Sequence, residues 1–304
     1  HASMGPSCAV ADVKNGGATV WTSTQGPHAL RQNLARVFGL DVAKTRVIFL
    51  DGAGSYGGNG NDDAAADAAL LAHAVPGRPV KLQYTREQEH RWEPYGSAMV
   101  IDIEAGVNEQ GDVLDWDLQI WSMPHSTRPQ GEPGNLLSAQ SLAKPHAQPL
   151  PGNLGPPNYA ADRNGIALYD FPGHQVLTHF ITQMPLRVSS HRGLGAYANV
   201  FSIESFMDEL AHQSGQDPLS FRLRHLKDPR AIDVLNTVVQ KSLWWNMPRE
   251  EGVGRGIAWA RYKNTGSWCA VAARVQAGEQ LRVLNIDVAV DVGQVIDLDG
   301  VINQ

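Results

Sequence analysis

A glycine-rich stretch at residues 52–60 constrains the fold of this chain more than any other segment. It follows a short run at 46–50 with the composition of a buried strand, and it precedes an alanine-rich run from Asp62 to about Val75 that predicts a helix. Small residues between a strand and a helix allow backbone N–H groups to approach an anion. The stretch is therefore a candidate ligand-binding loop, and a plain structural turn is the alternative with similar weight.

Two nucleotide-binding interpretations of this loop are weaker. Gly52, Gly54 and Gly57 have the G-x-G-x-x-G spacing of dinucleotide-binding loops, but Asp51 precedes the motif and no regular strand–helix–strand unit with an acidic partner follows it. The loop also lacks the lysine that a P-loop requires. A nucleotide-binding domain of another class stays a minor alternative.

Short strands and helices follow each other in an irregular order along the chain. Alternating and β-branched runs predict hairpins at 8–24 and 99–121, and apolar residues at helical spacing predict helices after Gly26-Pro27 and after Asp217. This order predicts an α+β fold with mixed sheets. We expect four parts: an α+β subdomain with the glycine loop at 1–123, a Pro/Gly-rich loop at 124–165, a strand, an Arg-Gly loop and helices at 166–250, and a β segment at 251–304.

The loop at 124–165 is rich in Pro, Gly, Asn and Gln and shows little periodicity. Most connections in compact domains have about 4–6 residues, and much longer ones are generally functional or disordered. We expect this loop to wrap a partner or to shape the mouth of a substrate site.

Composition excludes several classes of function. The 25 basic and 31 acidic residues give a formal charge of −6, which argues against nucleic acid or an anionic membrane surface as a partner. No run reaches the roughly 18 apolar residues of a transmembrane helix, and no signal peptide is visible. The compartment stays open between cytoplasm and periplasm. Both ends of the chain lack a terminal tail, so we expect the chain to be part of a longer protein.

Cysteine and histidine patterns predict no metal held by protein ligands. Cys8 and Cys269 form no CxxC pair, so this chain alone is not expected to hold an iron–sulfur cluster, and one disulfide or two free thiols fit equally. The eleven histidines form no HExxH or related pattern. We also expect Glu87 and Glu89 to lie on a solvated helix face and the pair Trp244-Trp245 to pack in a core.

Two further segments carry polar groups suited to ligand contact. Gln25 ends the run Thr22-Ser23-Thr24-Gln25 after a predicted strand, and its amide can donate to an oxo group or accept from a hydroxyl. Arg192-Gly193 places a guanidinium next to a small residue, which suits contact with phosphate or another oxyanion. Taken alone, a solvated turn residue and an ion-paired surface arginine are the commoner roles.

Taken together, these segments resemble one family. Thr22-Ser23-Thr24-Gln25, then a helix and the glycine loop, then the runs at 192–201, 203–211 and 217–223 are similar in order and spacing to the molybdenum-cofactor-binding subunit of the xanthine oxidase/aldehyde oxidoreductase family. The resemblance covers nearly the whole chain and is greatest to the bacterial branch with the isoquinoline 1-oxidoreductase and nicotinate dehydrogenase large subunits. It implies the α+β cofactor-binding fold of that family.

The resemblance implies a mononuclear molybdenum hydroxylase, whose metal is held by molybdopterin in the cytosine dinucleotide form. Such an enzyme oxidises an aldehyde or an N-heteroaromatic substrate, water supplies the oxygen, and the metal acts as a Lewis acid. It also implies that electrons pass to [2Fe-2S] clusters on a partner subunit or domain, with a cytochrome c as a further candidate partner. The cofactor carries the chemistry, and the protein orients and tunes it.

The same resemblance assigns roles to five residues of this chain. It implies that Gln25 hydrogen-bonds the apical oxo ligand of the metal and that Tyr56 and Gly57 pack against the metal centre. Arg192 and Gly193 border the opposite side. None of these residues is a direct ligand of the metal.

Three departures from the family pattern qualify these expectations. The family's Gly-Gly-Phe-Gly-Gly-Lys appears here as the run from Gly54 to Asn59, which keeps the aromatic residue and lacks the lysine. Gly60 stands where some relatives place an acidic substrate contact, which argues against purine specificity. The family's catalytic glutamate lies in a C-terminal segment that this chain does not contain, so we expect these residues alone to be inactive. A non-catalytic assembly module with vestigial cofactor loops is the alternative.

Overall fold

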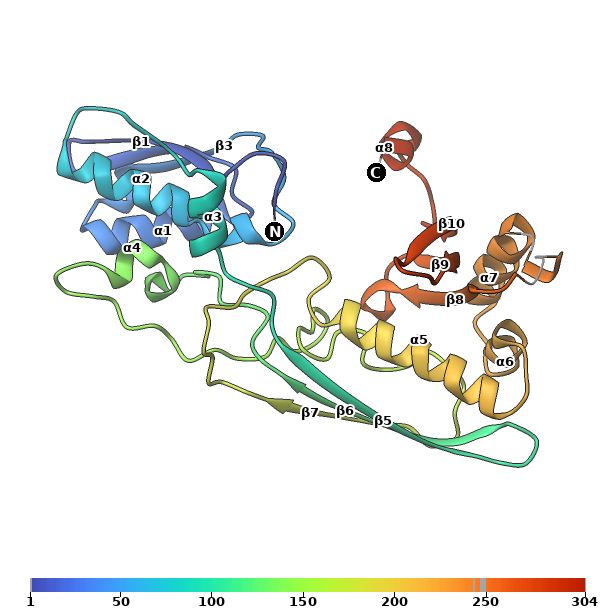
Figure 1. The fold of residues 1–304 in the computed structure, drawn as a ribbon. Helices are drawn as coiled ribbons and strands as arrows, with labels where there is room; N and C mark the ends of the chain where they lie inside the picture. Colours follow the sequence, from blue (N-terminus) through green and yellow to red (C-terminus); the bar gives the residue numbers. More distant parts are fainter. Residues whose placement is uncertain (1, 243, 247–249, 304) are drawn as a thin grey trace. The chain divides into compact units, whose positions relative to one another are not determined.

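The computed structural model describes residues 2–242, 244–246 and 250–303, and the chain divides into two compact units. Unit 1 comprises residues 1–98, 122–154 and 180–194, and unit 2 comprises residues 99–121, 155–179 and 195–304. The chain therefore alternates between the units, and each unit is built from segments far apart in sequence (Figure 1). The predicted α+β fold with mixed sheets is confirmed.

Unit 1 is a four-stranded mixed sheet with helices packed against it (Figure 1). The strand order is β3-β2-β1-β4, in which β1 is antiparallel to both β2 and β4 while β2 and β3 are parallel. Its elements are β1 (Cys8–Lys14), β2 (Gly17–Thr22), α1 (Pro27–Phe38), η1 (Val42–Lys44), β3 (Thr45–Phe49), η2 (Gly58–Asn61), α2 (Asp63–Ala74), β4 (Val80–Gln83), α3 (Arg86–Trp92), η3 (Pro133–Asn135) and α4 (Leu137–Gln140).

Local sequence signals account for most of unit 1. The predicted hairpin at 8–24 is present, with Asn15 and Gly16 at positive φ in its turn. The helix predicted after Gly26-Pro27 is α1, and Gly39 ends it in the left-handed conformation. Helix α2 packs closely on β1 because its inward residues are alanines, most of them fully buried. The small side chains bring the N-terminal end of α2 close to the sheet that carries the preceding loop.

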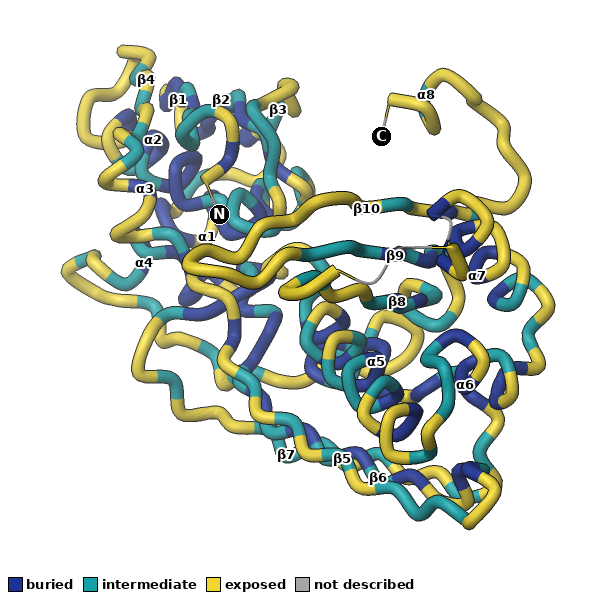
Figure 2. The backbone as a smooth tube through the Cα atoms, turned by 45° about the vertical axis from the view of Figure 1, so that its right-hand side comes forward, coloured by how far each residue is buried: buried dark blue, intermediate teal, exposed yellow. Residues whose placement is uncertain are grey.

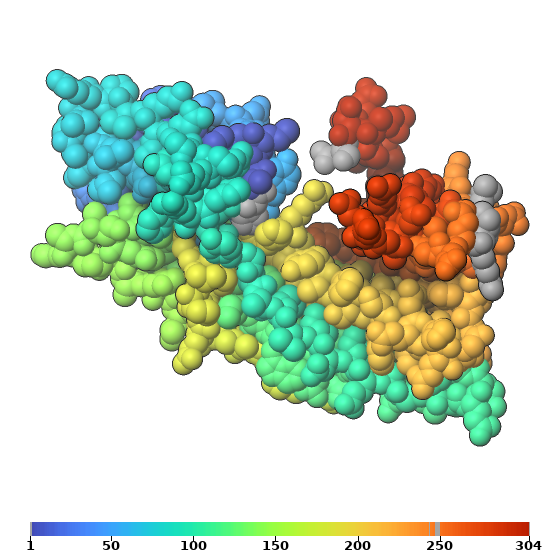
Figure 3. All heavy atoms as spheres, in the orientation of Figure 1, coloured from blue at the N-terminus to red at the C-terminus, as the bar shows by residue number. Residues whose placement is uncertain are grey.

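The predicted loop at 124–165 is partly structured. Its first part belongs to unit 1 and contains η3 and α4, with Leu136 and Ala139 buried in the unit 1 core. The space-filling view shows this segment, in green, lying directly against the N-terminal elements (Figure 3). The side chain of Arg36 on α1 donates to Gly131 O at 2.5 Å. This part of the loop packs against its own unit, and a role at a substrate mouth stays a prediction.

Unit 2 contains two three-stranded sheets, ordered β5-β6-β7 and β10-β9-β8, together with its own helices. Figure 2 shows that much of β10, at the edge of its sheet, is exposed. The elements are β5 (Met99–Val107), β6 (Val113–Ser122), β7 (Gln175–Phe180), α5 (Ala196–Gln213), α6 (Pro218–Arg224), α7 (Pro229–Ser242), η4 (Trp244–Asn246), β8 (Val253–Arg261), η5 (Tyr262–Asn264), β9 (Trp268–Gln276), β10 (Arg282–Asp291) and α8 (Leu298–Asn303).

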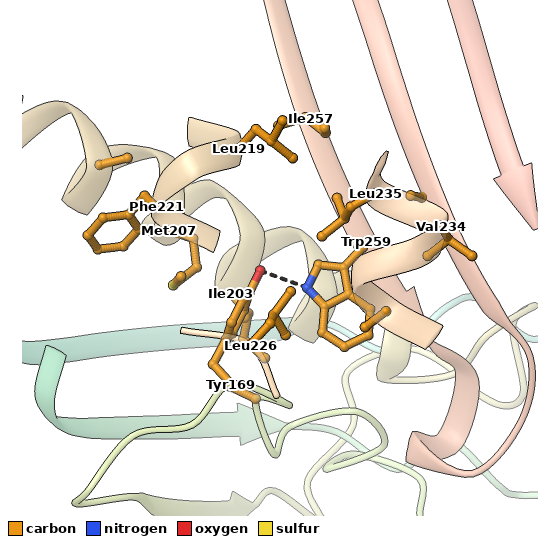
Figure 4. Packing of buried hydrophobic residues seen from close by; sticks show 14 of the residues in the cluster. Tyr169, Ile203, Met207, Leu219, Phe221, Leu226, Val234, Leu235, Ile257 and Trp259 are labelled. Carbon is orange, nitrogen blue, oxygen red and sulfur yellow. Dashed lines mark hydrogen bonds between the residues drawn. The ribbon is translucent and has the colours of Figure 1, made fainter. Parts of the chain in front are cut away.

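The core of unit 2 combines large apolar side chains with a buried ion pair. Trp259 Nε1 donates to the Tyr169 hydroxyl at 2.8 Å among aliphatic residues from α5, α6 and α7 (Figure 4). Beside it, Arg222 Nε donates to Glu204 at 2.9 Å, and Tyr169 donates to the same carboxylate at 2.8 Å. Burial raises the pKa of Glu204, and the Arg222 guanidinium opposes that shift. The runs at 203–211 on α5 and 217–223 at α6, together called the α5–α6 motif, therefore encode an internal ion pair.

Two expectations about packing need correction. Glu89 on α3 is buried, not solvated, because it accepts hydrogen bonds from Ser7 and Arg86. Trp244 is in the unit 2 core as predicted, whereas Trp245 is 59% exposed and does not share that role. Adjacent residues on a short 3₁₀ turn point in different directions, so a tryptophan pair need not be buried together.

The residues that the structure describes contain no disulfide, no membrane-spanning helix and no cluster of metal ligands. Cys8 and Cys269 are both free thiols. No described helix has the length and apolar character needed to cross a membrane. No group of three or more His, Cys, Asp or Glu side chains among residues 2–242, 244–246 and 250–303 could hold a metal ion.

Candidate functional site

All five predicted site residues lie in unit 1, on three loops. Gln25 is in the connection between β2 and α1, Tyr56 and Gly57 are in the glycine loop before η2, and Arg192 and Gly193 are in the segment that follows residue 180. The glycine loop lies against both of the other loops, through Ser23 on one side and Ser190 on the other.

The glycine loop has a backbone that most residues cannot adopt. Gly54 and Gly57 have φ values of +93° and +107°, and Tyr56 between them has φ of +48°. A Cβ atom on Gly54 would lie 2.6 Å from the Tyr56 ring, so the ring folds back over the loop. Tyr56 remains 39% exposed. The Tyr56 ring therefore packs on the backbone of its own loop and remains partly accessible to a ligand.

Gly57 is the point at which the glycine loop touches the Arg192 loop. A Cβ atom there would lie 2.2 Å from Ser190 O and 3.2 Å from His191 Cα, both backbone atoms, so only glycine fits. At the other end of the loop, a Cβ atom on Gly52 would lie 2.5 Å from the Ser23 side chain. The first loop, which carries Gln25, is therefore also in contact with the glycine loop.

Asn59, at the position of the family's lysine, braces the loop internally. Its Nδ2 donates to Gly54 O at 2.6 Å, and its Oδ1 lies 2.5 Å from the Ser7 hydroxyl. The same hydroxyl lies 2.8 Å from Glu89 Oε1, and Ser7 N donates to that oxygen at 2.9 Å. Asn59 holds the loop on α3 and the start of β1, so its amide is engaged within the protein.

Gln25 has a fixed backbone and an exposed side chain. Gly26 N donates to Thr24 Oγ1 at 3.1 Å, which holds the turn on both sides of Gln25. The Thr24 hydroxyl in turn hydrogen-bonds Asp62 at the start of α2. The amide of Gln25 makes no hydrogen bond to another residue of the described parts of the chain, so it is free to meet a ligand.

Asp62 is the most perturbed acid of this site. Burial raises its pKa to about 7, and the Thr24 hydrogen bond and the Arg128 guanidinium act in the opposite direction. Arg128 also reaches the glycine loop, where its Nη2 lies 3.4 Å from Gly57 O. A neutral Asp62 beneath the loops is therefore populated near neutral pH.

Arg192 offers an unpaired guanidinium in an exposed position. Among residues 2–242, 244–246 and 250–303 no carboxylate forms an ion pair with it. Gly193 follows with φ of +90°, and Leu194 N donates back to His191 O at 2.8 Å to close a tight turn. The ion-paired surface role that the sequence left open does not apply within the described chain.

Sequence reasoning missed the residues that hold these loops. Arg187 pairs with Asp63 through two hydrogen bonds, and Ser190 supplies the carbonyl against Gly57. The sequence indicates only that Asp63 suits the positive end of a helix. No local pattern connects Asp63 to an arginine 124 positions later.

Comparison with known proteins gives the family of this chain. Residues 1–132 match the family model of the molybdopterin cofactor-binding domain. The chain is 38% identical to a nicotinate dehydrogenase subunit from Pseudomonas putida, with 100% of this chain and 26% of the relative aligned. It is 28% identical to the beta subunit of isoquinoline 1-oxidoreductase from Brevundimonas diminuta, with 94% of this chain and 35% of that protein aligned. The chain thus spans about a quarter to a third of the length of these relatives.

Solved structures show the same fold. The aldehyde oxidoreductase of Desulfovibrio gigas superposes with a TM-score of 0.62 at 20% identity, over 91% of this chain and 30% of that chain. The fold, the matched domain and the curated relatives agree with the resemblance in the sequence. The chain belongs to the xanthine oxidase/aldehyde oxidoreductase family and contains its molybdopterin cofactor-binding domain.

Proposed function

We propose that this chain forms the cofactor-facing part of a molybdenum hydroxylase that oxidises an aldehyde or an N-heteroaromatic compound with water as the oxygen source. The observation that carries the proposal is the backbone contact of Gly57 with Ser190, which joins the glycine loop to the Arg192 loop within unit 1. Unit 1 also holds most of the residues that match the family model. When bound, the molybdenum cofactor supplies Lewis-acid and redox chemistry.

The groups on these loops fit such a cofactor. A molybdopterin carries phosphate, for which an exposed guanidinium without a carboxylate partner, as at Arg192, is a suitable ligand. Gly57 and Gly193 leave no side chain between their backbone and a bound group, and both have positive φ. The donors are neutral or cationic, which matches an anionic ligand.

Each residue has a separate task in this proposal. The free amide of Gln25 donates a hydrogen bond to a ligand atom of the metal centre. Tyr56 packs its exposed ring against the centre, and the Gly57 N–H is available beside it. Arg192 and Gly193 border the opposite side, where the guanidinium attracts and orients negative charge. None of these groups is a base for the substrate reaction.

The remaining parts of the machinery are proposed to lie outside these residues. The catalytic glutamate comes from another segment of the full-length protein, so residues 1–304 alone are expected to be inactive. The cofactor is proposed to be the cytosine dinucleotide form. Its electrons pass to a [2Fe-2S] partner subunit or domain, with a cytochrome c as a further acceptor. The relatives from Pseudomonas and Brevundimonas are both named as subunits, which supports the expectation of a partner.

Metal and pterin analysis of the full-length protein tests the proposal. Purified from a host that makes molybdenum cofactors, it should contain about one molybdenum and one pterin per chain, and acid treatment should release a cytosine nucleotide. Gln25→Ala should slow turnover of an aldehyde or N-heteroaromatic substrate with the metal content retained. Protein that is folded and holds neither molybdenum nor pterin would reject the proposal.

A further inference from the structure

We infer that Asp63 and Arg187 form a positioning clamp that holds the glycine loop against the Arg192 loop. This inference rests on the proposed function of those two loops. Asp63 and Arg187 are separate from the candidate ligand groups on the two loops. Their proposed task is to fix the distance between the loops.

The clamp begins with a two-point ion pair. Arg187 Nη1 lies 2.7 Å from Asp63 Oδ2, and Arg187 Nη2 lies 3.1 Å from Asp63 Oδ1. The side chains are 19% and 10% exposed, so solvent screens the pair only weakly. A bidentate arginine–carboxylate pair fixes orientation as well as distance, because the guanidinium fork and the carboxylate are both planar.

The remaining hydrogen-bonding capacity of the pair is used on backbone groups. Arg187 donates to Trp92 O and to Asn135 O, each at 3.1 Å, and Asp63 Oδ1 accepts from Leu137 N at 3.2 Å. The pair thus connects four chain segments of unit 1. A surface ion pair that served solubility alone would not engage three backbone groups from two further segments of the chain.

Each partner is directly connected to one of the loops. Asp63 is the first residue of α2 and follows η2, with which the glycine loop ends. Arg187 lies three positions before Ser190, whose carbonyl meets Gly57. Between them the chain is held by a parallel bridge of Val188 with Tyr95, and Thr127 Oγ1 donates to Val188 O at 2.5 Å. These interactions restrict the backbone between Arg187 and Ser190.

The contact of Gly57 with Ser190 depends on the relative position of the two loops. Because the Gly57 backbone packs on the backbone of Ser190 and His191 without a side chain between them, a small shift of either loop changes the groups presented beside it. Ser190 Oγ donates to His125 O at 3.0 Å and supports its own side of the contact. Asp63 lies next to the glycine loop and Arg187 next to the Arg192 loop, so their ion pair joins the two sides of this contact.

Hydrogen exchange on the full-length protein tests the clamp independently of activity. Arg187→Gln should raise amide exchange at least tenfold in both 52–60 and 187–194, and Asp63→Asn should do the same. The effect of the double variant should be clearly smaller than the sum of the two single effects, because both variants remove the same ion pair. Arg230→Lys is the matched control, since Arg230 and Asp291 form a two-point pair in unit 2, and it should change neither loop.

Cofactor content gives a second readout. Arg187→Gln should lose most of its molybdenum and pterin while its melting temperature stays within a few degrees of the Arg230→Lys control. Exchange that rises near residue 187 only, or single variants whose effects simply add, would overturn the clamp. If the unmodified protein holds no molybdenum, the proposed function fails, whereas coupled exchange of the two loops still decides the clamp.

Discussion

Each unit contains an arginine–carboxylate pair shielded from solvent, fully buried in unit 2 and partly buried in unit 1, and the two pairs have different surroundings. In unit 2, Arg222 and Glu204 are 18 positions apart and bond to helix carbonyls, to Tyr169 and to a strand N–H, all within one core. In unit 1, Arg187 and Asp63 are 124 positions apart and bond to the backbone of loops. The first pair stabilises a core, and the second determines how loops meet. Similar chemistry therefore serves stability in one unit and site geometry in the other.

The largest expected effect is on the stability of unit 2. Arg222→Ala leaves Glu204 buried without its cation and should lower the free energy of unfolding by about 3–5 kcal/mol. Urea unfolding followed by tryptophan fluorescence measures this, because Trp259 lies beside the pair. Arg224→Ala, which removes the exposed Arg224–Asp112 pair, should cost at most about 1 kcal/mol. Equal losses in the two variants would contradict a core role for Arg222.

Asp62 should make the stability of unit 1 depend on pH. Its pKa of about 7 in the folded chain exceeds the ordinary value of 3.8, so the folded state binds the proton more tightly. Stability should therefore fall as the pH rises from about 4 to 7 and level off above it, by up to about 4 kcal/mol in total. Asp62→Asn should remove the Asp62 contribution to this slope in unfolding measured across pH, whereas Asp51→Asn, at an exposed position, should retain it.

Gly57 tests the contact between the loops. Gly57→Ala combines a strained φ of +107° with a clash against Ser190 O, and it should cost about 1–3 kcal/mol and reduce cofactor content. Gly131→Ala is the control, because φ is +89° there and no atom lies within 4 Å of the added Cβ. The control therefore measures the cost of a positive φ without a steric clash. If both variants behave alike in melting temperature and molybdenum content, the contact has no special importance.

The same comparison explains which features the sequence reveals. The hairpins, the alanine helix α2 and the α5–α6 motif follow from local periodicity, turn residues and capping, so they can be read directly from the chain. The pairing of Asp63 with Arg187 and the contact of Gly57 with Ser190 depend on distant segments that no local pattern relates. Glu89 shows the same limit, because its burial results from Ser7, 82 positions earlier. The resemblance proposes the loop residues as candidates, and it names none of the residues that support them.

The smallest expected effect concerns Asn59 and separates bracing from ligand contact. Asn59→Ala removes the hydrogen bond to Gly54 O and the contact with Ser7, which should cost about 1 kcal/mol. Asn285→Ala on β10 provides the control, since its exposed amide bonds only Asp287 two residues away, and it should cost a few tenths of that amount. Because the Asn59 amide is engaged inside the protein, the variant should keep the KM for substrate while exchange in 52–60 rises. A changed KM with unchanged exchange would instead place Asn59 among the residues that meet the substrate.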